Sequence, residues 1–424
     1  MKIQSKLLAS TIAAACALSF AATAATGIPL ASSRSVVAPG ALATAEHIHV
    51  AVDHAPVAVS WALPANRPIN AAPKPFEQVS REFLVNASGA ELQRGVVLPL
   101  TAAGDIVRIS PVGASSAAID SKHVQFSAGG HTLTAAQASK TLASGVQMQQ
   151  AGMPIQRGST VLKLADNVAA GGTKVMAQGA RGDYLIQVYE PNSPFALTLV
   201  ANHGTRLAGE PVQIAVNFAR PAKPAAGTAA VSQASLDRVT GVLVAPDGWS
   251  ESVRFAPGAN GSYVADVTPP TAHAGERGLW EVHAFANASS GGKTVLREAT
   301  NAFAVVLPTA RLDRVPVKVA AHAGRAVNVD VRIDVAAASR YAVSGVLYGH
   351  ARNGQLEPAA YAQSAAWLEP GRRVPIRLGF SAAALAKSGL AGPYQLRDLS
   401  LEDQVQLGVL DRRAVAARGL VAGR

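Results

Sequence analysis

Residues 46–54, with the sequence EHIHVAVDH, carry the side chains in this chain that are best suited to metal chemistry. Three histidines and an aspartate occur within this short stretch, at His47, His49, Asp53 and His54. Imidazole and carboxylate groups are the ligands that zinc and related divalent ions take in many hydrolases. The alternative is a half-buried strand in which His47 and His49 share the solvent-facing side, because side chains of a strand alternate between its faces.

Two classes of metal-dependent hydrolase have a similar motif, and neither fits well. The metallo-β-lactamase pattern is H-x-H-x-D-H, whereas the spacing here is H-x-H-x-x-x-D-H, two residues longer. The amidohydrolase H-x-H pair ends the first strand of a (β/α)₈ barrel, and this sequence lacks the helices of such a barrel. A catalytic site also needs a third ligand and supporting hydrogen bonds. We therefore expect no cofactor, with a weak divalent-metal site at His47, His49, Asp53 and His54 as the alternative.

Two carboxylates near the C-terminus, Asp398 and Asp403, could ligate Ca²⁺ through their oxygens. They lie in the segment RDLSLEDQ, residues 397–404. Leu396 and Leu399 break the alternation there, which predicts that Asp398 is a bulge residue. Because Arg397 can pair with these carboxylates, a structural network is the favoured interpretation, and calcium binding is the alternative.

One aromatic residue, Trp249, is a candidate for ligand binding. It follows the turn sequence PDG and is expected to be the most exposed of the four tryptophans. An exposed aromatic ring on a β-sandwich can stack on a sugar ring. Packing of Trp249 within its own loop is the alternative, and Trp280, in an alternating strand, is expected in a core.

Other catalytic motifs are absent or out of context. The segment NASSGGKT, residues 287–294, ends like a phosphate-binding loop, but Asn287 replaces the first glycine and both flanking segments are strand-like. A hairpin loop is the better interpretation. No G-x-S-x-G motif is present, which excludes a typical α/β-hydrolase.

Residues 1–24 are typical of a signal peptide. Lys2 and Lys6 precede an apolar run, and Ala22-Thr23-Ala24 has the small-x-small pattern of a cleavage site. Cleavage near Ala24 would deliver the chain to the periplasm or the extracellular space, with lipidation of Cys16 as a disfavoured alternative. The mature chain would then contain no cysteine and no transmembrane segment, which excludes disulfides and thiolate metal sites.

The chain is basic, with a formal net charge of +11. From Leu312 onward, 15 Lys or Arg residues stand against 9 Asp or Glu residues, so the excess is concentrated in the C-terminal third. A cationic surface attracts anionic polymers, although it also simply aids solubility. Aromatic and basic residues do not interleave as a single-stranded nucleic-acid platform requires, so no specific nucleic-acid binding is expected.

Short alternating segments, broken by turn residues every 8–12 positions, predict an all-β fold. Val212–Phe218 and Val327–Ile333 place every second residue on an apolar face. We expect an N-terminal β-rich domain over residues 25–190, with 25–75 loosely ordered, followed by two immunoglobulin-like β-sandwiches over 195–308 and 309–424. Within the first domain, residues 134–150 are the one plausible helix, which Gly145 weakens.

Several segments resemble known bacterial proteins. APDGW (245–249), GSYVADV (261–267), GLWEVHAFA (278–286) and REATNAFAV (297–305) resemble strands of bacterial extracellular immunoglobulin-like modules, and GPYQLRDLSLEDQ (392–404) resembles the end of a sandwich found behind them. Residues 82–112 resemble the N-terminal domain of an uncharacterised family of secreted proteobacterial proteins. The resemblance touches all three regions and implies no catalytic residue. Type II secretion of some members would imply extracellular delivery.

Taken with the missing catalytic motifs, the sandwich array predicts a non-enzymatic binding or scaffolding protein. Its partner would be a glycan, an envelope component or a protein outside the cell, with an anionic polymer as one form of that ligand. The alternative is a secreted hydrolase whose active site lies in the N-terminal domain, with the sandwiches as accessory modules.

Overall fold

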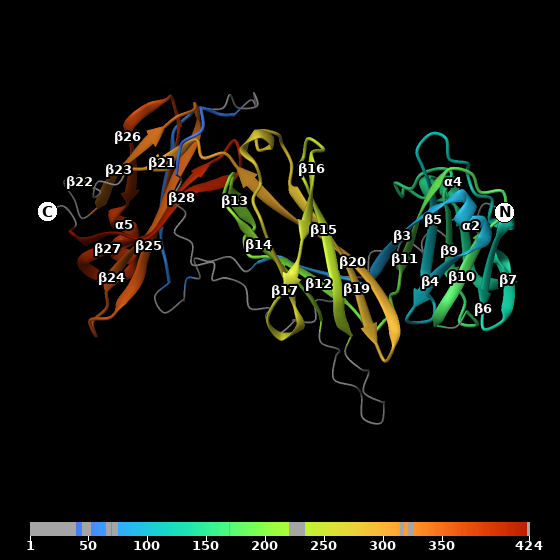
Figure 1. The fold of residues 1–424 in the computed structure, drawn as a ribbon. Helices are drawn as coiled ribbons and strands as arrows, with labels where there is room; N and C mark the ends of the chain where they lie inside the picture. Colours follow the sequence, from blue (N-terminus) through green and yellow to red (C-terminus); the bar gives the residue numbers. More distant parts are fainter. Residues whose placement is uncertain are drawn as a thin grey trace.

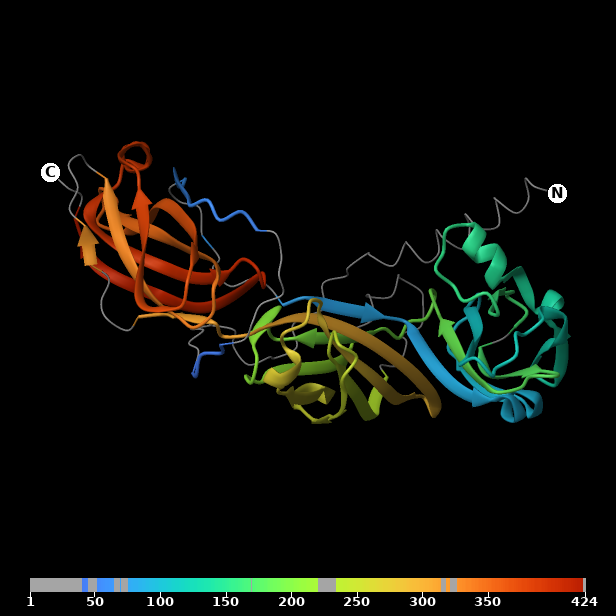
Figure 2. The ribbon, with the colours of Figure 1, turned by 90° about the horizontal axis from the view of Figure 1, so that it is seen from above.

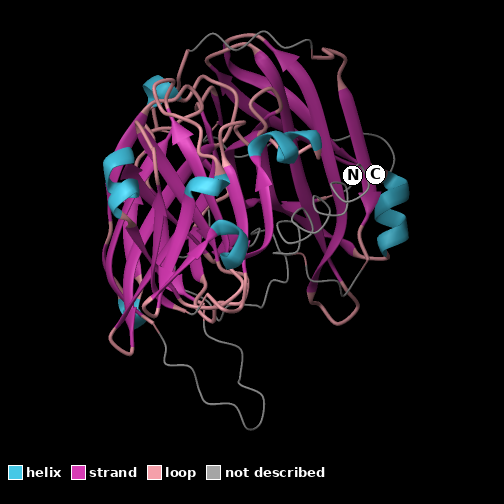
Figure 3. Ribbon diagram, turned by 90° about the vertical axis from the view of Figure 1, so that its right-hand side faces the viewer, coloured by secondary structure: helices cyan, strands magenta, loops and turns pink. Residues whose placement is uncertain are grey.

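The protein folds into three β-rich domains arranged in a row, as shown by a computed structural model (Figure 1). The structure describes residues 40–44, 52–64, 69, 75–168, 170–219, 234–313, 318–320 and 326–421. Strands dominate, and the helices are short (Figure 3). The predicted all-β class is therefore confirmed, whereas the predicted signal peptide lies outside the described residues.

The N-terminal domain consists of two sheets, with strand orders β4-β10-β6-β7 and β3-β11-β5-β9-β8. They share one core, in which Phe126 and Val175 of the smaller sheet meet Val107 and Ile186 of the larger. Its elements are β3 (Glu82–Ser88), α2 (Gly89–Arg94), β4 (Val96–Leu100), β5 (Ile106–Val112), η1 (Ser121–His123), β6 (Val124–Ala128), β7 (His131–Thr134), α3 (Ala135–Ala138), β8 (Ser139–Ser144), α4 (Gly145–Gln150), β9 (Thr160–Leu164), β10 (Gly171–Ala177) and β11 (Asp183–Tyr189).

The middle domain is a sandwich of two sheets, β17-β18-β14-β12-β2 and β16-β15-β19-β20, with β13 added beside β20. Leu199 and Ile214 of one sheet pack with Trp280 and Val282 of the other, which confirms the core position predicted for Trp280. The elements are β2 (Glu77–Ser80), β12 (Leu197–Ala201), β13 (Thr205–Leu207), β14 (Val212–Phe218), β15 (Ser235–Val244), β16 (Ser250–Arg254), β17 (Ala256–Pro257), η2 (Ala259–Gly261), β18 (Tyr263–Val267), η3 (Thr271–His273), β19 (Trp280–Ser290) and β20 (Lys293–Val306).

The C-terminal domain packs the sheet β1-β25-β24-β27-β28 on a second sheet in which β23 pairs with β21, β22 and β26. The alternate residues of β23 are buried from Val327 to Val335, as the apolar pattern predicts. The elements are β1 (Val57–Ala62), β21 (Ala310–Leu312), β22 (Lys318–Ala320), β23 (Val327–Val335), β24 (Ser339–His350), β25 (Leu356–Leu368), β26 (Gly371–Phe380), α5 (Ala382–Ser388), β27 (Ala391–Asp403) and β28 (Gly408–Leu420).

The first strands do not belong to the N-terminal domain, in contrast to the expected domain of residues 25–190. β1 pairs with β25 of the C-terminal domain, and β2 pairs with β12 of the middle domain. Figure 2 shows the blue segment beside the C-terminal domain and the lighter blue strands reaching the N-terminal domain. Alternation within a short strand does not reveal a partner about 300 residues away, so the sequence pattern missed this arrangement.

The single helix expected over residues 134–150 is also wrong. The structure contains two short helices, α3 and α4, separated by β8, which pairs with β9. Thr134 caps α3 and Ser144 caps α4, each through a capping box with a glutamine three residues later. Two capping boxes ten residues apart therefore mark two helix starts. No helix among the described residues has the length and apolarity to cross a membrane.

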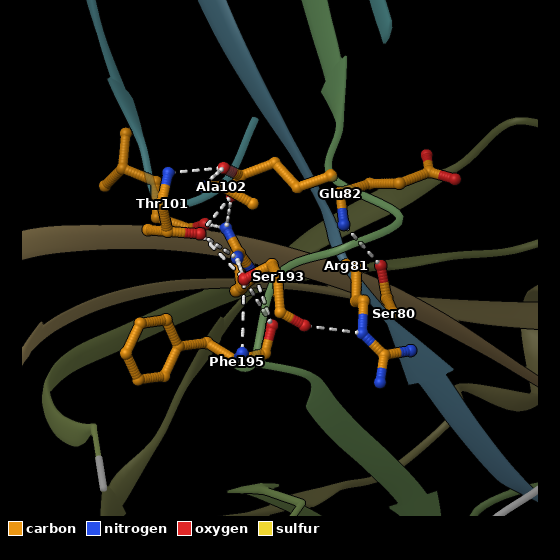
Figure 4. A network of polar contacts seen from close by, with 10 residues as sticks. Ser80, Arg81, Glu82, Thr101, Ala102, Ser193 and Phe195 are labelled. Atoms are coloured by element: carbon orange, nitrogen blue, oxygen red, sulfur yellow. Dashed lines mark hydrogen bonds and ion pairs between the residues drawn. The ribbon is translucent and has the colours of Figure 1, made fainter. Parts of the chain in front are cut away.

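A buried ion pair joins the N-terminal and middle domains. Arg297 of β20 and Glu190, just after β11, lie 2.6 Å apart between Nη1 and Oε2, and neither side chain is exposed. Arg297 also donates to the Phe195 carbonyl and to the hydroxyls of Thr101 and Ser193, which converge in Figure 4. Glu190 accepts from the Thr101 backbone N–H at 2.5 Å. A buried ion pair is tolerated when its remaining donors and acceptors are satisfied, and this network fixes the junction.

Asp105 is a neighbour of the ion pair that lacks such partners. Its side chain is 1% exposed, and neither carboxylate oxygen accepts a hydrogen bond from the described residues. Burial, reinforced by the negative charge of Glu190, raises the pKa of Asp105 to about 8, although Arg297 opposes the shift. Asp105 is therefore mostly protonated at neutral pH, which avoids an uncompensated buried charge.

We predict that Asp105→Asn weakens the pH dependence of stability. An unfolded aspartate has a pKa of about 4. Between about pH 4 and about pH 8 the folded state therefore holds one more proton than the unfolded state. This contribution is fully present below about pH 4 and is lost as the pH rises through about 8, by up to about 1.4 kcal/mol per pH unit. Urea unfolding across this range should show a smaller fall in the free energy of unfolding for the variant. Parallel curves for the two proteins would contradict the assignment.

We also predict that Arg297→Met lowers the free energy of unfolding by about 3–5 kcal/mol, because Glu190 is left buried without its cation. The double variant Arg297→Met/Glu190→Gln should recover part of this loss. Arg254→Gln, at an exposed position of β16, is the control and should change stability by less than about 0.5 kcal/mol. Denaturant unfolding measures all three, and equal stability of Arg297→Met and Arg254→Gln would refute the prediction.

Candidate ligand-binding surface

The outer face of the sheet β1-β25-β24-β27-β28 is the candidate binding surface. Ala360 and Ala362 of β25 are fully buried in the C-terminal core. Their neighbours Tyr361 and Gln363 therefore point to the opposite, outer side of the sheet. β1 lies at one edge and extends this outer face by one strand.

Residues of all five strands align in rows across the outer face. The first row joins two aromatic residues to an arginine, and the second contains a glutamine, two serines and another arginine. In strand order the rows are Trp61, Tyr361, Val346, Arg397 and Val415, then Val59, Gln363, Ser344, Ser400 and Arg412, then Val57, Ala365, Ala342, Glu402 and Val409.

Trp61 is the aromatic side chain most accessible on this face. It is 49% exposed, and its ring centroid lies 4.7 Å from that of Tyr361 at an interplanar angle of 36°. The exposed valines Val57 and Val59 continue the same side of β1. Two adjacent rings, with Trp61 half exposed, form an aromatic platform that can stack against a ligand.

Another aromatic residue, Tyr348, and an arginine lie together on the neighbouring strands β24 and β27. The Arg397 guanidinium lies 4.8 Å from the Tyr348 ring centroid and donates from Nε and Nη2 to the side-chain oxygen of Gln395. Burial raises the pKa of the Tyr348 hydroxyl, and Asp398 adds to the shift, so Tyr348 remains a hydrogen-bond donor at neutral pH. The face thus combines apolar rings with fixed donors.

A second aromatic pair lies further along β25. His54 stacks on Trp367, with ring centroids 3.9 Å apart and an interplanar angle of 7°. Arg340 donates to the carbonyls of Asp53 and Ala55 and so holds the residues before β1 in place. Tyr361 and Trp367 are separated by about 20 Å along the strand, so the two aromatic pairs bracket an elongated surface.

The residues of the predicted metal site are only partly described. His47 and His49 lie outside the described residues. Asp53 accepts a hydrogen bond from the Ala55 N–H at 2.9 Å, and the His54 ring stacks on Trp367. Within the described ranges, no three His, Cys, Asp or Glu residues are grouped to hold a metal. The metal hypothesis therefore stays a prediction.

Trp249 packs within its own domain, and the expectation that it is the most exposed tryptophan is wrong. Its ring stacks on His273 at 4.8 Å and meets Trp280 edge to face at 5.9 Å. The turn causes this orientation, because Asp247 accepts hydrogen bonds from both the Trp249 N–H and the His273 ring. The loop-packing alternative describes this geometry.

The two aspartates proposed for calcium are engaged with other groups. Asp403 is fully buried and accepts hydrogen bonds from the hydroxyls of Thr309 and Ser339 and from the Gln406 side chain. Asp398 has a positive φ of 51° at a register shift, as expected for a bulge, and lies 3.7 Å from Arg412. These contacts match a structural network, and its arginine is Arg412 instead of the expected Arg397.

The aromatic platform was missed from the sequence, although a signal for it exists. In β1, Val57, Val59 and Trp61 alternate with the smaller Ala58 and Ser60, which indicates a strand with a large apolar side. The usual assumption places that side in the core. In the structure Ala62 packs against the core, whereas Trp61, in register with Tyr361 of β25, lies on the outer side and is 49% exposed.

Comparison with known proteins identifies the fold. The chain matches the N-terminal domain of a domain of unknown function, DUF4785, over residues 49–190, and the C-terminal domain of the same family over residues 310–418. A crystal structure of a DUF4785 family protein from Legionella pneumophila is 19% identical, with a TM-score of 0.64. The match covers 89% of this chain and 97% of that chain.

Other comparisons add little. The crystal structure of trypsin-activated alpha-2-macroglobulin from Escherichia coli is 13% identical over 76% of this chain and 22% of that chain, with a TM-score of 0.19. No curated protein matches this sequence. The two domain matches and the shared fold across all three domains assign the chain to the DUF4785 family of proteins of unknown function.

Proposed function

We propose that this protein is an exported, non-enzymatic binding protein, and that the outer face of its C-terminal sheet binds an extracellular or envelope glycan. The observation that carries the proposal is the pair of adjacent rings of Trp61 and Tyr361, with Trp61 half exposed beside polar side chains. Sugar rings present apolar C–H faces and hydroxyl edges. The platform offers the complementary arrangement of aromatic faces and hydrogen-bonding groups.

The polar side chains around the platform favour a sugar over a purely apolar partner. Gln363 and Ser344 occupy the row next to Trp61 and Tyr361, and their side chains both donate and accept hydrogen bonds. Arg397 and Arg412 add positive charge to the same face. Arg412 lies 3.7 Å from Asp398, so Arg397, which donates to the neutral Gln395 side chain, is the arginine that would give an acidic sugar a charge-assisted hydrogen bond.

The alternative of a hydrolase with its active site in the N-terminal domain finds less support. One pocket of that domain, beside α4, is lined by one acidic residue, Glu82, and no histidine. General acid and base catalysis of hydrolysis commonly uses two such groups within reach of the substrate. The binding hypothesis rests instead on a surface whose groups have matching chemistry.

We predict that Trp61→Ala weakens retention of the full-length protein on an insoluble polysaccharide by about fivefold, because loss of a stacked ring removes on the order of 1 kcal/mol of binding free energy. Suitable probes are chitin, cellulose and purified peptidoglycan sacculi, and depletion of the protein from solution gives the dissociation constant. Tyr361→Ala should act in the same direction.

Phe285→Ala is the matched control, because Phe285 is an exposed aromatic residue (39%) on β19 of the middle domain. It should bind as the unaltered protein does. Absence of retention on all three polymers, or equal retention of Trp61→Ala and Phe285→Ala, would refute the glycan-binding surface. Release of soluble sugar fragments by the unaltered protein would favour the hydrolase instead.

A further inference from the structure

The N-terminal domain contains a small pocket that is separate from its main core. α4 and the segment after it lie beside β5, β9 and β11 and border an open-sided cavity of about 260 Å³. Met148, Met153, Ile155 and Val161 form its apolar wall. Most of these residues belong to a satellite cluster of their own, apart from the cluster that fills the domain.

The sheet side of the pocket brings polar residues into this apolar setting. Arg108 of β5 pairs in register with Gln187 of β11 on one side and with Val161 of β9 on the other. Glu82 of β3 lies in the adjacent row, beside Tyr189. All five residues line the cavity, so a guanidinium, an amide and a carboxylate converge on one side of it.

The Arg108 Nε is the buried donor in the lining that lacks a hydrogen-bond partner among the described residues. Glu82, the acidic residue of the lining, is not the acceptor for the Arg108 Nε. Its carboxylate instead accepts a hydrogen bond from the Gln187 side chain at 2.6 Å. A buried guanidinium donor without an acceptor is energetically costly, and an anion in the pocket would remove that cost.

We propose that this pocket binds a small organic carboxylate with an apolar body, the carboxylate pairing with Arg108 and the apolar part packing against Met148, Met153 and Ile155. A guanidinium matches a carboxylate through two parallel hydrogen bonds. The volume is near the lower limit of ligand pockets, which selects a ligand the size of a single amino acid or a short carboxylic acid. Two sources share this chemistry: a free carboxylic acid, and the C-terminal residue of a peptide.

Methionine methyl NMR can test this on the full chain. The sequence has four methionines, of which Met148 and Met153 line the pocket. Met176 lies on β10 in the other sheet and serves as an internal reference. Titration with hexanoate or 3-phenylpropionate should shift the methyl signals of Met148 and Met153 and leave that of Met176 unchanged. The matching neutral amides, hexanamide and 3-phenylpropanamide, should bind at least tenfold more weakly.

The source of the ligand is tested with the tripeptide Gly-Gly-Phe, with a free or an amidated C-terminus. Binding of the free acid form at least as tight as that of 3-phenylpropionate identifies a peptide C-terminus, and weaker binding identifies a free acid. Either result supports the carboxylate chemistry. If the amidated tripeptide binds as well as the free acid form, the role of Arg108 as the anion partner is wrong.

Three variants complete the test. Arg108→Gln should weaken carboxylate binding at least tenfold, whereas Arg254→Gln, an equally charge-reducing change on exposed β16, should not. An unchanged Met176 signal in Arg108→Gln verifies that the domain is folded. If that variant does not fold, Arg108→Lys, which keeps the charge but not the two-pronged geometry, should still bind more weakly than the unaltered protein. Equal binding of acids and amides, or full binding by Arg108→Gln, would overturn the proposal.

Discussion

The described parts of residues 40–80 constrain the whole molecule, because they contribute strands to two domains before the third domain begins. The Ala43 N–H donates to the Pro308 carbonyl at the start of the C-terminal domain. β1 then completes the outer sheet of that domain, β2 completes a sheet of the middle domain, and β3 opens the N-terminal domain. Edge strands leave backbone donors and acceptors unpaired unless another strand covers them. The aromatic surface thus forms only when segments near both ends of the chain pair.

The middle and N-terminal domains are joined by a shared sheet and a buried ion pair. β20 meets β3 at the pair Glu298 and Glu82, so one sheet extends across the junction. A single ladder position gives little resistance to bending, and the Arg297–Glu190 network supplies the missing rigidity. Because its ion pair is fully buried and its donors reach three further residues, movement of one domain would break several charge-assisted hydrogen bonds at once.

Sequence reasoning was successful where a property is local and unsuccessful where it depends on distant pairing. Period-two alternation placed the apolar sides of β14 and β23 in their cores, and the broken alternation before Leu399 located the bulge at Asp398. Alternation identifies two sides of a strand, but it does not say which sheet the strand joins. For that reason the strand pattern does not show that Trp61 lies on the surface. The turn before Trp249 instead makes Trp249 the candidate for an exposed ring. The pocket around Arg108 depends on three paired strands and could not be read from spacing.

Glu82 connects the pocket to the domain junction. It lines the cavity near Arg108 and also faces Glu298 across the β3–β20 pair. Burial, with the negative charge of Glu82 adding to it, raises the pKa of Glu298 to about 7, and one Glu298 oxygen has no hydrogen-bond partner among the described residues. An anion beside Arg108 would add a further negative charge close to Glu82 in a site of low dielectric. The small pocket and the interdomain contact therefore share one carboxylate, Glu82.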